Sequence, residues 1–305
     1  MTGSLPTGVI TFPVTPMDDT AAINLGVYRE LLDRTLDTGV AGVAPASTTG
    51  EGPYLTRDER MMLLEETVSH VAGRAAVVAS ASAASTSEAI AYAKHAEAAG
   101  ADVVLASVVQ FFPLDRSEIR RHYLALAEAT ELPIVLYNQP LSGIDLDPDL
   151  VAELAGATER IGGVKEASGL VSRVGAIARQ TDPGFVVYCG HGDVALPSFL
   201  VGATGWFTAM ANLVPTECQD MFDLAMAGDW ASARDLFEAM APLCNLIYRR
   251  QLAANMKAAL RDIGIPVGHA RAPLSAPSDR DRELMKMHLA KLTSRPISRP
   301  ASQAS

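Results

Sequence analysis

Cysteine is scarce in this chain, and the few that occur are widely spaced. The three cysteines are Cys189, Cys218 and Cys244, and no two of them form a CxxC pair. A sparse, odd set of cysteines excludes a disulfide-stapled scaffold and is typical of proteins that fold in a reducing compartment. The six histidines show no metal-ligand spacing, so the sequence predicts no metal site.

The chain also lacks an excess of positive charge and any apolar run long enough to cross a bilayer. Asp and Glu number 35 against 25 for Lys and Arg, and a chain this acidic is a poor ligand for nucleic acid backbones. The most apolar stretch, 103–112, is short and interrupted by Ser107 and Gln110. The N-terminus has neither the basic nor the apolar region of a signal peptide. We therefore expect a cytoplasmic protein that binds neither nucleic acid nor membrane.

Two kinds of segment alternate through most of the sequence. Short β-branched apolar runs alternate with longer, alanine-rich segments of helical periodicity. Strands are predicted at 8–14, 40–46, 75–81, 101–107, 132–137, 161–165, 184–189 and 203–208. Helix signals stand between them: the capping patterns Thr56-x-x-Glu59 and Ser85-x-x-Glu88, the pair Asp147-Pro148, and the helix-ending glycines Gly39 and Gly100.

This rhythm predicts an α/β fold of the (β/α)8, or TIM barrel, class. Strand–helix units in series call for a parallel sheet covered by helices, and eight such units can close into a barrel. An open doubly wound sheet would carry a glycine-rich turn after its first strand, where this chain has Thr15-Pro16-Met17. We expect the barrel over 1–228, a C-terminal helical extension over 229–292, with helices at 229–262 and 278–292, and a disordered tail over 293–305.

One lysine stands in an unusual place in this pattern. Lys165 follows the apolar run 161–164 inside a predicted strand, near the barrel end where active sites lie. Burial there would lower the pKa of its ammonium group and expose a nucleophilic amine, which forms imines with ketones. The alternative is a lysine whose ammonium group reaches solvent or pairs with Glu166.

Two other strand ends carry polar groups. Tyr137 ends the fifth predicted strand and could transfer protons at a buried imine, or it could be an aromatic residue of the barrel wall. Ser47, Thr48, Thr49 and Gly50 form a turn rich in hydroxyl groups and backbone donors after the second strand. Such a turn can hold a carboxylate, or its residues can simply be helix caps and turn formers.

Taken together, these strand ends resemble the dihydrodipicolinate synthase and N-acetylneuraminate lyase family of Schiff-base pyruvate enzymes. The matching segments are 8–16, Thr48-Thr49-Gly50-Glu51, Tyr137-Asn138-x-Pro140 and Gly163-Val164-Lys165-Glu166-Ala167-Ser168, in the family's order and spacing. The resemblance implies that Lys165 forms the imine and that Tyr137 and Thr48 relay protons. It implies that Thr49, with Ser47 and Gly50, binds the pyruvate carboxylate. It also implies that no metal or organic cofactor is needed, and that the protein forms a homo-oligomer built as a dimer of dimers.

Two departures from the family bear on the substrate. Lysine-synthesis members carry an arginine shortly after the Tyr-Asn-x-Pro motif, where this chain has Leu141-Ser142-Gly143. A second relay tyrosine of many members falls at Phe111.

We therefore predict a lyase, a class I aldolase, that acts on pyruvate or a 2-oxo acid, for example a 2-keto-3-deoxy sugar acid. Gln139, Ser142 and His191 are expected to contact the distal part of the substrate, although His191 could instead cap the following helix. Dihydrodipicolinate synthase itself, a Schiff-base dehydratase or deaminase, and a non-catalytic 2-oxo-acid-binding module are the alternatives.

Overall fold

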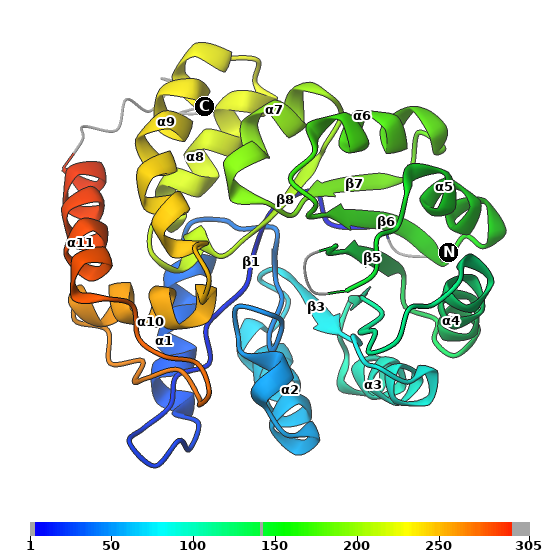
Figure 1. The fold of residues 1–305 in the computed structure, drawn as a ribbon, viewed down its shortest axis with the longest axis horizontal. Helices are drawn as coiled ribbons and strands as arrows, with labels where there is room; N and C mark the ends of the chain where they lie inside the picture. Colours follow the sequence, from blue (N-terminus) through cyan, green and yellow to red (C-terminus); the bar gives the residue numbers. More distant parts are fainter. Residues whose placement is uncertain (1–3, 141–142, 295–305) are drawn as a thin grey trace.

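The computed structural model describes residues 4–140 and 143–294, and in these ranges eight parallel strands close into a barrel (Figure 1). Each strand pairs with the next one in the sequence, and β8 pairs with β1 to close the ring. The strands are β1 Gly8–Thr11, β2 Gly42–Val43, β3 Ala76–Ser80, β4 Val103–Ala106, β5 Ile134–Asn138, β6 Ile161–Glu166, β7 Val186–Cys189 and β8 Gly205–Thr208. The predicted (β/α)8 class is confirmed.

Helices follow the strands on the outside of the barrel. They are α1 Leu25–Leu36, α2 Arg57–Val71, α3 Thr86–Ala99, α4 Arg116–Glu128, α5 Pro148–Ala157, α6 Val171–Gln180, α7 Ala195–Leu200 and α8 Pro215–Met226. The capping signals form as expected: Thr56 and Glu59 make a reciprocal capping box, and Asp147 accepts a bond from the Leu150 N–H group. No helix in the described ranges is both long and apolar enough to cross a membrane.

Three further helices form the C-terminal extension. α9 (Trp230–Ile247), α10 (Leu252–Asp262) and α11 (Asp279–Thr293) lie together on one side of the barrel (Figure 1). The range 229–262 is helical as expected, but it is two helices rather than one, because the chain breaks at 248–251, where Arg250 has a φ of 55°. The side-chain amide of Asn255 donates to the carbonyl oxygens of Leu246 and Arg249, so it stabilises the end of α9 at this break. Most of the predicted tail, 295–305, lies outside the described residues.

The first strand is shorter than its apolar run predicts. The run 8–14 leaves the sheet ladder after Thr11, although the N–H group of Phe12 still donates to the carbonyl of Thr208. Pro13 has no N–H group to donate to a neighbouring strand. The N–H group of Val14 is taken by the side chain of Asn212. The chain therefore turns out of the barrel while remaining buried.

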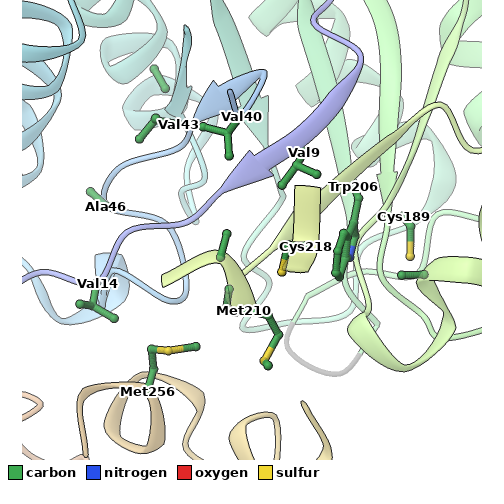
Figure 2. Close-up of a cluster of buried hydrophobic side chains, with 14 of the residues drawn as sticks. Val9, Val14, Val40, Val43, Ala46, Cys189, Trp206, Met210, Cys218 and Met256 are labelled. Carbon is green, nitrogen blue, oxygen red and sulfur yellow. The ribbon is translucent and has the colours of Figure 1, made fainter. Parts of the chain in front are cut away.

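Apolar side chains form two layers, one inside the barrel and one between the barrel and its helices. Because neighbouring residues of a strand face opposite sides, Ile10 belongs to the inner layer and Val9 to the outer one. Figure 2 shows the outer layer around Val9, where Met256 of α10 joins the side chains of the barrel. The extension therefore shares a hydrophobic core with the barrel.

Candidate active site

Lys165 is buried at the centre of the barrel among aromatic rings. Its side chain is 3% exposed, and its ammonium nitrogen lies 3.6 Å from the centre of the Tyr137 ring and 4.3 Å from that of Phe12. Burial lowers the pKa of this lysine, and the neighbouring Tyr137 offsets only part of the effect. The alternative in which the ammonium group reaches solvent is wrong. This environment favours the neutral, nucleophilic amine that imine chemistry needs.

The other alternative, a pair between Lys165 and Glu166, is also wrong. The carboxylate of Glu166 accepts bonds of 2.7 Å from the side-chain amide of Asn138 and from the N–H group of Ser168. The guanidinium of Arg173 lies 3.6 Å away. Adjacent residues of a strand face opposite sides, so Glu166 points out of the barrel interior while Lys165 points into it. Glu166 therefore connects the ends of β5 and β6, and no carboxylate among the described residues pairs with the lysine amine.

The register of two strands places Tyr137 beside Lys165. β5 and β6 are paired so that Tyr137 lies opposite Lys165 and Asn138 opposite Glu166. The phenol group and the amine therefore approach each other at the C-terminal end of the barrel. A phenol beside the amine can exchange protons with the groups that form and break an imine.

Gly190 makes room for the lysine, and sequence reasoning missed it. A Cβ atom at Gly190 would lie 2.8 Å from Cε and 2.9 Å from Cγ of Lys165, and 2.9 Å from Cβ of Ala167. Only glycine fits at this position without moving one of these groups. The signal in the sequence was a glycine directly after an apolar strand, which is also found in ordinary turns.

The turn after β2 is held in an unusual backbone conformation. Ala46 and Glu51, at its two ends, have φ angles of 48° and 61°, which belong to the left-handed region. The hydroxyl of Thr15 donates to the carbonyl of Gly50 at 2.7 Å. A Cβ atom at Gly52 would lie 2.0 Å from the carbonyl oxygen of Ala46, so the two ends of the turn pack directly on each other.

The middle of this turn presents donors at the barrel mouth. The side chains of Ser47 and Thr49 are buried and that of Thr48 is exposed. Within residues 4–140 and 143–294, no backbone acceptor takes the N–H groups of Thr48 and Thr49. Free N–H groups on successive residues form a concave site for an anion such as a carboxylate.

The residues predicted to meet the distal part of the substrate are only partly placed. Gln139 follows Asn138, the last residue of β5, and is half-buried, and its backbone carbonyl accepts from the N–H group of Gly143. Its side-chain oxygen is buried and has no partner among the described residues. Ser142 lies outside the described residues.

His191 does not act as a helix cap. It precedes the short 3-10 helix Gly192–Val194, but its side chain makes no capping hydrogen bond there. Its ring lies against Gly169 and 6.0 Å from the ring of Tyr248, and no partner in the described part of the chain takes its buried Nδ1. The capping alternative is therefore wrong, and the ring is left to interact with a ligand or with its aromatic neighbour.

Among the residues that the structure describes, no metal-binding cluster accompanies these groups. In the ranges that the structure describes, no three His, Cys, Asp or Glu side chains are placed to share a metal ion. The groups that gather at the barrel mouth are an amine, a phenol, hydroxyls and backbone N–H groups. These groups suit acid–base and imine chemistry on a small carboxylate.

Comparison with known proteins assigns this arrangement to one family. The model of the Dihydrodipicolinate synthetase family matches residues 5–292. The chain belongs to this family. The match spans the barrel and the C-terminal helices together, so both are features of the dihydrodipicolinate synthetase family.

Individual relatives agree along nearly their whole length. The 4-hydroxy-tetrahydrodipicolinate synthase of Methanopyrus kandleri is 35% identical over 287 residues, covering 93% of this chain and 96% of that protein. The enzyme of the same name from Thiobacillus denitrificans is 34% identical, covering 92% and 94%. The solved 4-hydroxy-tetrahydrodipicolinate synthase from Methylacidiphilum fumariolicum superposes with a TM-score of 0.91 at 30% identity, covering 94% and 96%.

Membership of the dihydrodipicolinate synthetase family decides the enzyme class of this chain. The dihydrodipicolinate synthetase family consists of Schiff-base-forming lyases, so the predicted enzyme class is confirmed. The non-catalytic binding module thereby loses its support. The individual roles of Lys165, Tyr137 and Thr48 stay predictions.

Proposed function

We propose that this chain joins pyruvate to an aldehyde through an imine on Lys165. Its relatives share the name 4-hydroxy-tetrahydrodipicolinate synthase, which supports synthesis of a dicarboxylate. The amine attacks the 2-keto carbon of pyruvate, and loss of water gives the imine. Removal of a proton from the methyl group gives an enamine, whose carbon attacks the aldehyde. Hydrolysis then releases the product and restores the amine. No metal or organic cofactor is needed, because the protonated imine accepts the electron pair.

The observation that carries this proposal is the buried amine of Lys165 beside the phenol of Tyr137. Tyr137 and Thr48 would transfer the protons at the carbinolamine hydroxyl, which leaves as water, and at the new alcohol. The N–H groups of Thr48 and Thr49 would hold the pyruvate carboxylate, which fixes the keto carbon relative to the amine. 4-Hydroxy-tetrahydrodipicolinate is a cyclic imine with two carboxylates, as forms when an amine condenses with the 2-keto group derived from pyruvate, so the second substrate would be an amino acid aldehyde.

Intact mass spectrometry tests the imine directly. The protein is incubated with pyruvate and borohydride, beside a Lys165→Ala variant. We expect a stable adduct of reduced pyruvate on the wild-type chain and none on the variant. Consumption of pyruvate in the presence of amino acid aldehydes would then identify the second substrate. If neither pyruvate nor a panel of longer 2-oxo acids gives an adduct, the proposal is wrong.

A second candidate is cleavage of a 2-keto-3-deoxy sugar acid by the same imine. It is favoured by Leu141-Ser142-Gly143, which replaces the arginine expected in lysine-synthesis members, and by Phe111 in place of the second relay tyrosine. A panel of sugar acids separates the candidates. Release of pyruvate supports the sugar acid lyase, and loss of water or ammonia without pyruvate supports a dehydratase or deaminase.

We also propose that the protein works as a homo-oligomer in which Phe111 lies at a contact between subunits. Phe111 is 92% exposed and Phe112 is 74% exposed, and their rings pack edge to face with their centres 5.4 Å apart. The pair lies in the segment between β4 and α4. Two neighbouring exposed aromatic rings form an apolar patch of the kind that protein contacts bury.

A further inference from the structure

A second lysine of this chain is completely buried, and it is far from the first in sequence. Lys257 of α10 is 0% exposed, and its ammonium nitrogen lies 2.5 Å from a carboxylate oxygen of Glu51, which is also 0% exposed. The same nitrogen donates to the carbonyl of His269 at 2.9 Å. Burying two charges is costly unless each is closely paired and hydrogen-bonded. The position of one partner therefore fixes that of the other.

Glu51 is the last residue of the turn that presents the N–H groups of Thr48 and Thr49. Its own N–H group donates to the carbonyl of Thr48, and its backbone is in the left-handed region. Its second carboxylate oxygen accepts the N–H group of Arg271 at 2.6 Å. In the part of the chain that the structure describes, the ion pair and the hydrogen bond of this carboxylate both come from the C-terminal extension. The extension therefore holds the turn at its end.

The side chain of Arg271 fixes the segment 267–271 of the extension to the outside of the barrel. Its guanidinium donates to both carboxylate oxygens of Glu59 on α2, each at 2.7 Å, and also to the carbonyl of Tyr54. A Cβ atom at Gly268 would lie 1.8 Å from the carbonyl oxygen of Met17, so the segment is closely packed against the barrel. The segment 267–271 is thus anchored independently of Glu51.

The hydrophobic core also attaches the C-terminal extension to the barrel. Met256, the residue before Lys257, points into the outer core layer that also contains Val14 and Met210 (Figure 2). Its burial fixes α10 against the barrel and so fixes the backbone that carries Lys257. Lys257 therefore lies on a helix that is packed against the barrel, rather than on a loop.

We infer that the C-terminal extension positions the carboxylate-binding turn through the buried Glu51–Lys257 ion pair. Glu51 and Lys257 are positioning residues for the 2-oxo acid, and neither touches the reacting atoms. This inference rests on the proposed function of the turn. Left-handed conformations at Ala46 and Glu51 persist only where the surroundings hold them. Without the ion pair the turn relaxes, and the N–H groups of Thr48 and Thr49 no longer converge on a carboxylate.

The Lys257→Met variant tests the inference, because it keeps an unbranched side chain that is one heavy atom shorter and removes the charge. We expect the pyruvate concentration for half-maximal borohydride trapping to rise about 10- to 100-fold, since a small displacement of a binding group has effects of this order. The trapping rate at saturating pyruvate should stay within about two-fold, because Lys165 and Tyr137 are unchanged. A general loss of structure would not separate these two quantities in this way.

A matched control comes from the same extension. Arg282→Met breaks an ion pair with Asp262, a buried carboxylate of α10 that does not contact the turn. It should lower thermal stability without changing the half-saturating pyruvate concentration. The double variant Glu51→Gln/Lys257→Met leaves no unpaired buried charge, and it replaces Lys257→Met if that variant does not fold. A folded variant whose half-saturating concentration equals that of the wild type would overturn the inference.

Hydrogen exchange distinguishes a failure of this inference from a failure of the proposed function. In the Lys257→Met variant, and not in Arg282→Met, the hydrogen-bonded amides of Glu51 and Gly52 should exchange faster in the absence of any substrate. If the wild-type protein forms no imine, the proposed function is wrong, and exchange still shows whether the extension holds the turn. Unchanged exchange in the Lys257→Met variant would count against the ion pair as a positioning device.

Discussion

Lys165 and Tyr137 lie opposite each other on neighbouring strands, with the ammonium nitrogen 3.6 Å from the centre of the tyrosine ring. The face of the ring attracts the ammonium group, whereas burial away from water disfavours its charge. The effect of burial is the larger one, because the pKa of Lys165 is lowered. The pair therefore combines an amine that loses its proton more easily than an exposed lysine with a nearby phenol, as imine formation requires.

The lowered pKa of Lys165 predicts how imine formation depends on pH. Below this pKa the amine is protonated and cannot attack a ketone, and above it the amine is free. The rate of trapping with pyruvate should therefore rise with pH and level off below the pKa of an exposed lysine. Borohydride trapping at short times across the neutral and alkaline range measures this profile. A rate that levels off only where exposed lysines lose their protons would contradict the prediction.

Burial of Lys165 should also reduce the stability of the fold. Because its pKa is lower in the folded state than in the unfolded state, the cost of burying the charge is fully present below both values and disappears as pH rises. Lys165→Met should raise the free energy of unfolding at neutral pH by about 1–2 kcal/mol, as removal of a destabilising active-site group often does. Denaturant unfolding measures this change, with the exposed Lys94→Met as control. A less stable Lys165→Met variant would show that the lysine stabilises the barrel.

Gly190→Ala should impair the lysine without unfolding the barrel. The added methyl group would overlap both Lys165 and Ala167 and push the amine away from Tyr137. We expect trapping with pyruvate to slow by about 10- to 100-fold. The matched control is Gly184→Ala, just before the same strand β7, where a Cβ atom would meet nothing within 4 Å. Equal trapping rates for the two variants would mean that the lysine adapts to the methyl group.

The barrel and the lysine could be predicted because both leave local signals in the sequence. Short β-branched apolar runs mark buried strands, and a period of 3.6 residues in apolar side chains marks helices, so the order of strands and helices was predictable. A charged residue inside an apolar run is rare enough to make Lys165 a candidate without any tertiary information. The side chain of Tyr137 was equally visible, but its closeness to Lys165 depends on strand register, which no local pattern determines.

Features that depend on distant contacts were not predictable. The break between α9 and α10 has no proline or glycine at 248–251, and it is stabilised by the side chain of Asn255 from the following helix. The need for glycine at position 190 appears only when the side chain of Lys165 is in place. The pair between Glu51 and Lys257 joins opposite ends of the chain, and each residue looks like an ordinary charged residue in its own segment.

The ion pair of Glu59 with Arg271 should contribute stability that is lost in acid. The guanidinium of Arg271 holds the pKa of Glu59 at about 2, below its usual value of 4.5. The contribution is therefore present above the usual value and disappears as pH falls toward about 2. Glu59→Gln should lower the free energy of unfolding at neutral pH by about 1 kcal/mol, because the pair is partly exposed and screened by solvent. Urea unfolding at several pH values should show this difference shrinking in acid, and a constant difference would contradict it.

The exposed ring of Phe111 should determine whether subunits associate. If this ring is buried between subunits, Phe111→Asp places a charge in an apolar contact, and association should weaken about 100-fold or more. Sedimentation velocity at several protein concentrations would show a shift toward smaller species. Met287→Asp, at another exposed apolar residue on α11, is the matched control and should leave the assembly unchanged. If Phe111→Asp and the wild type sediment alike, the contact lies elsewhere, and the substitution of tyrosine by phenylalanine here has no bearing on a neighbouring active site.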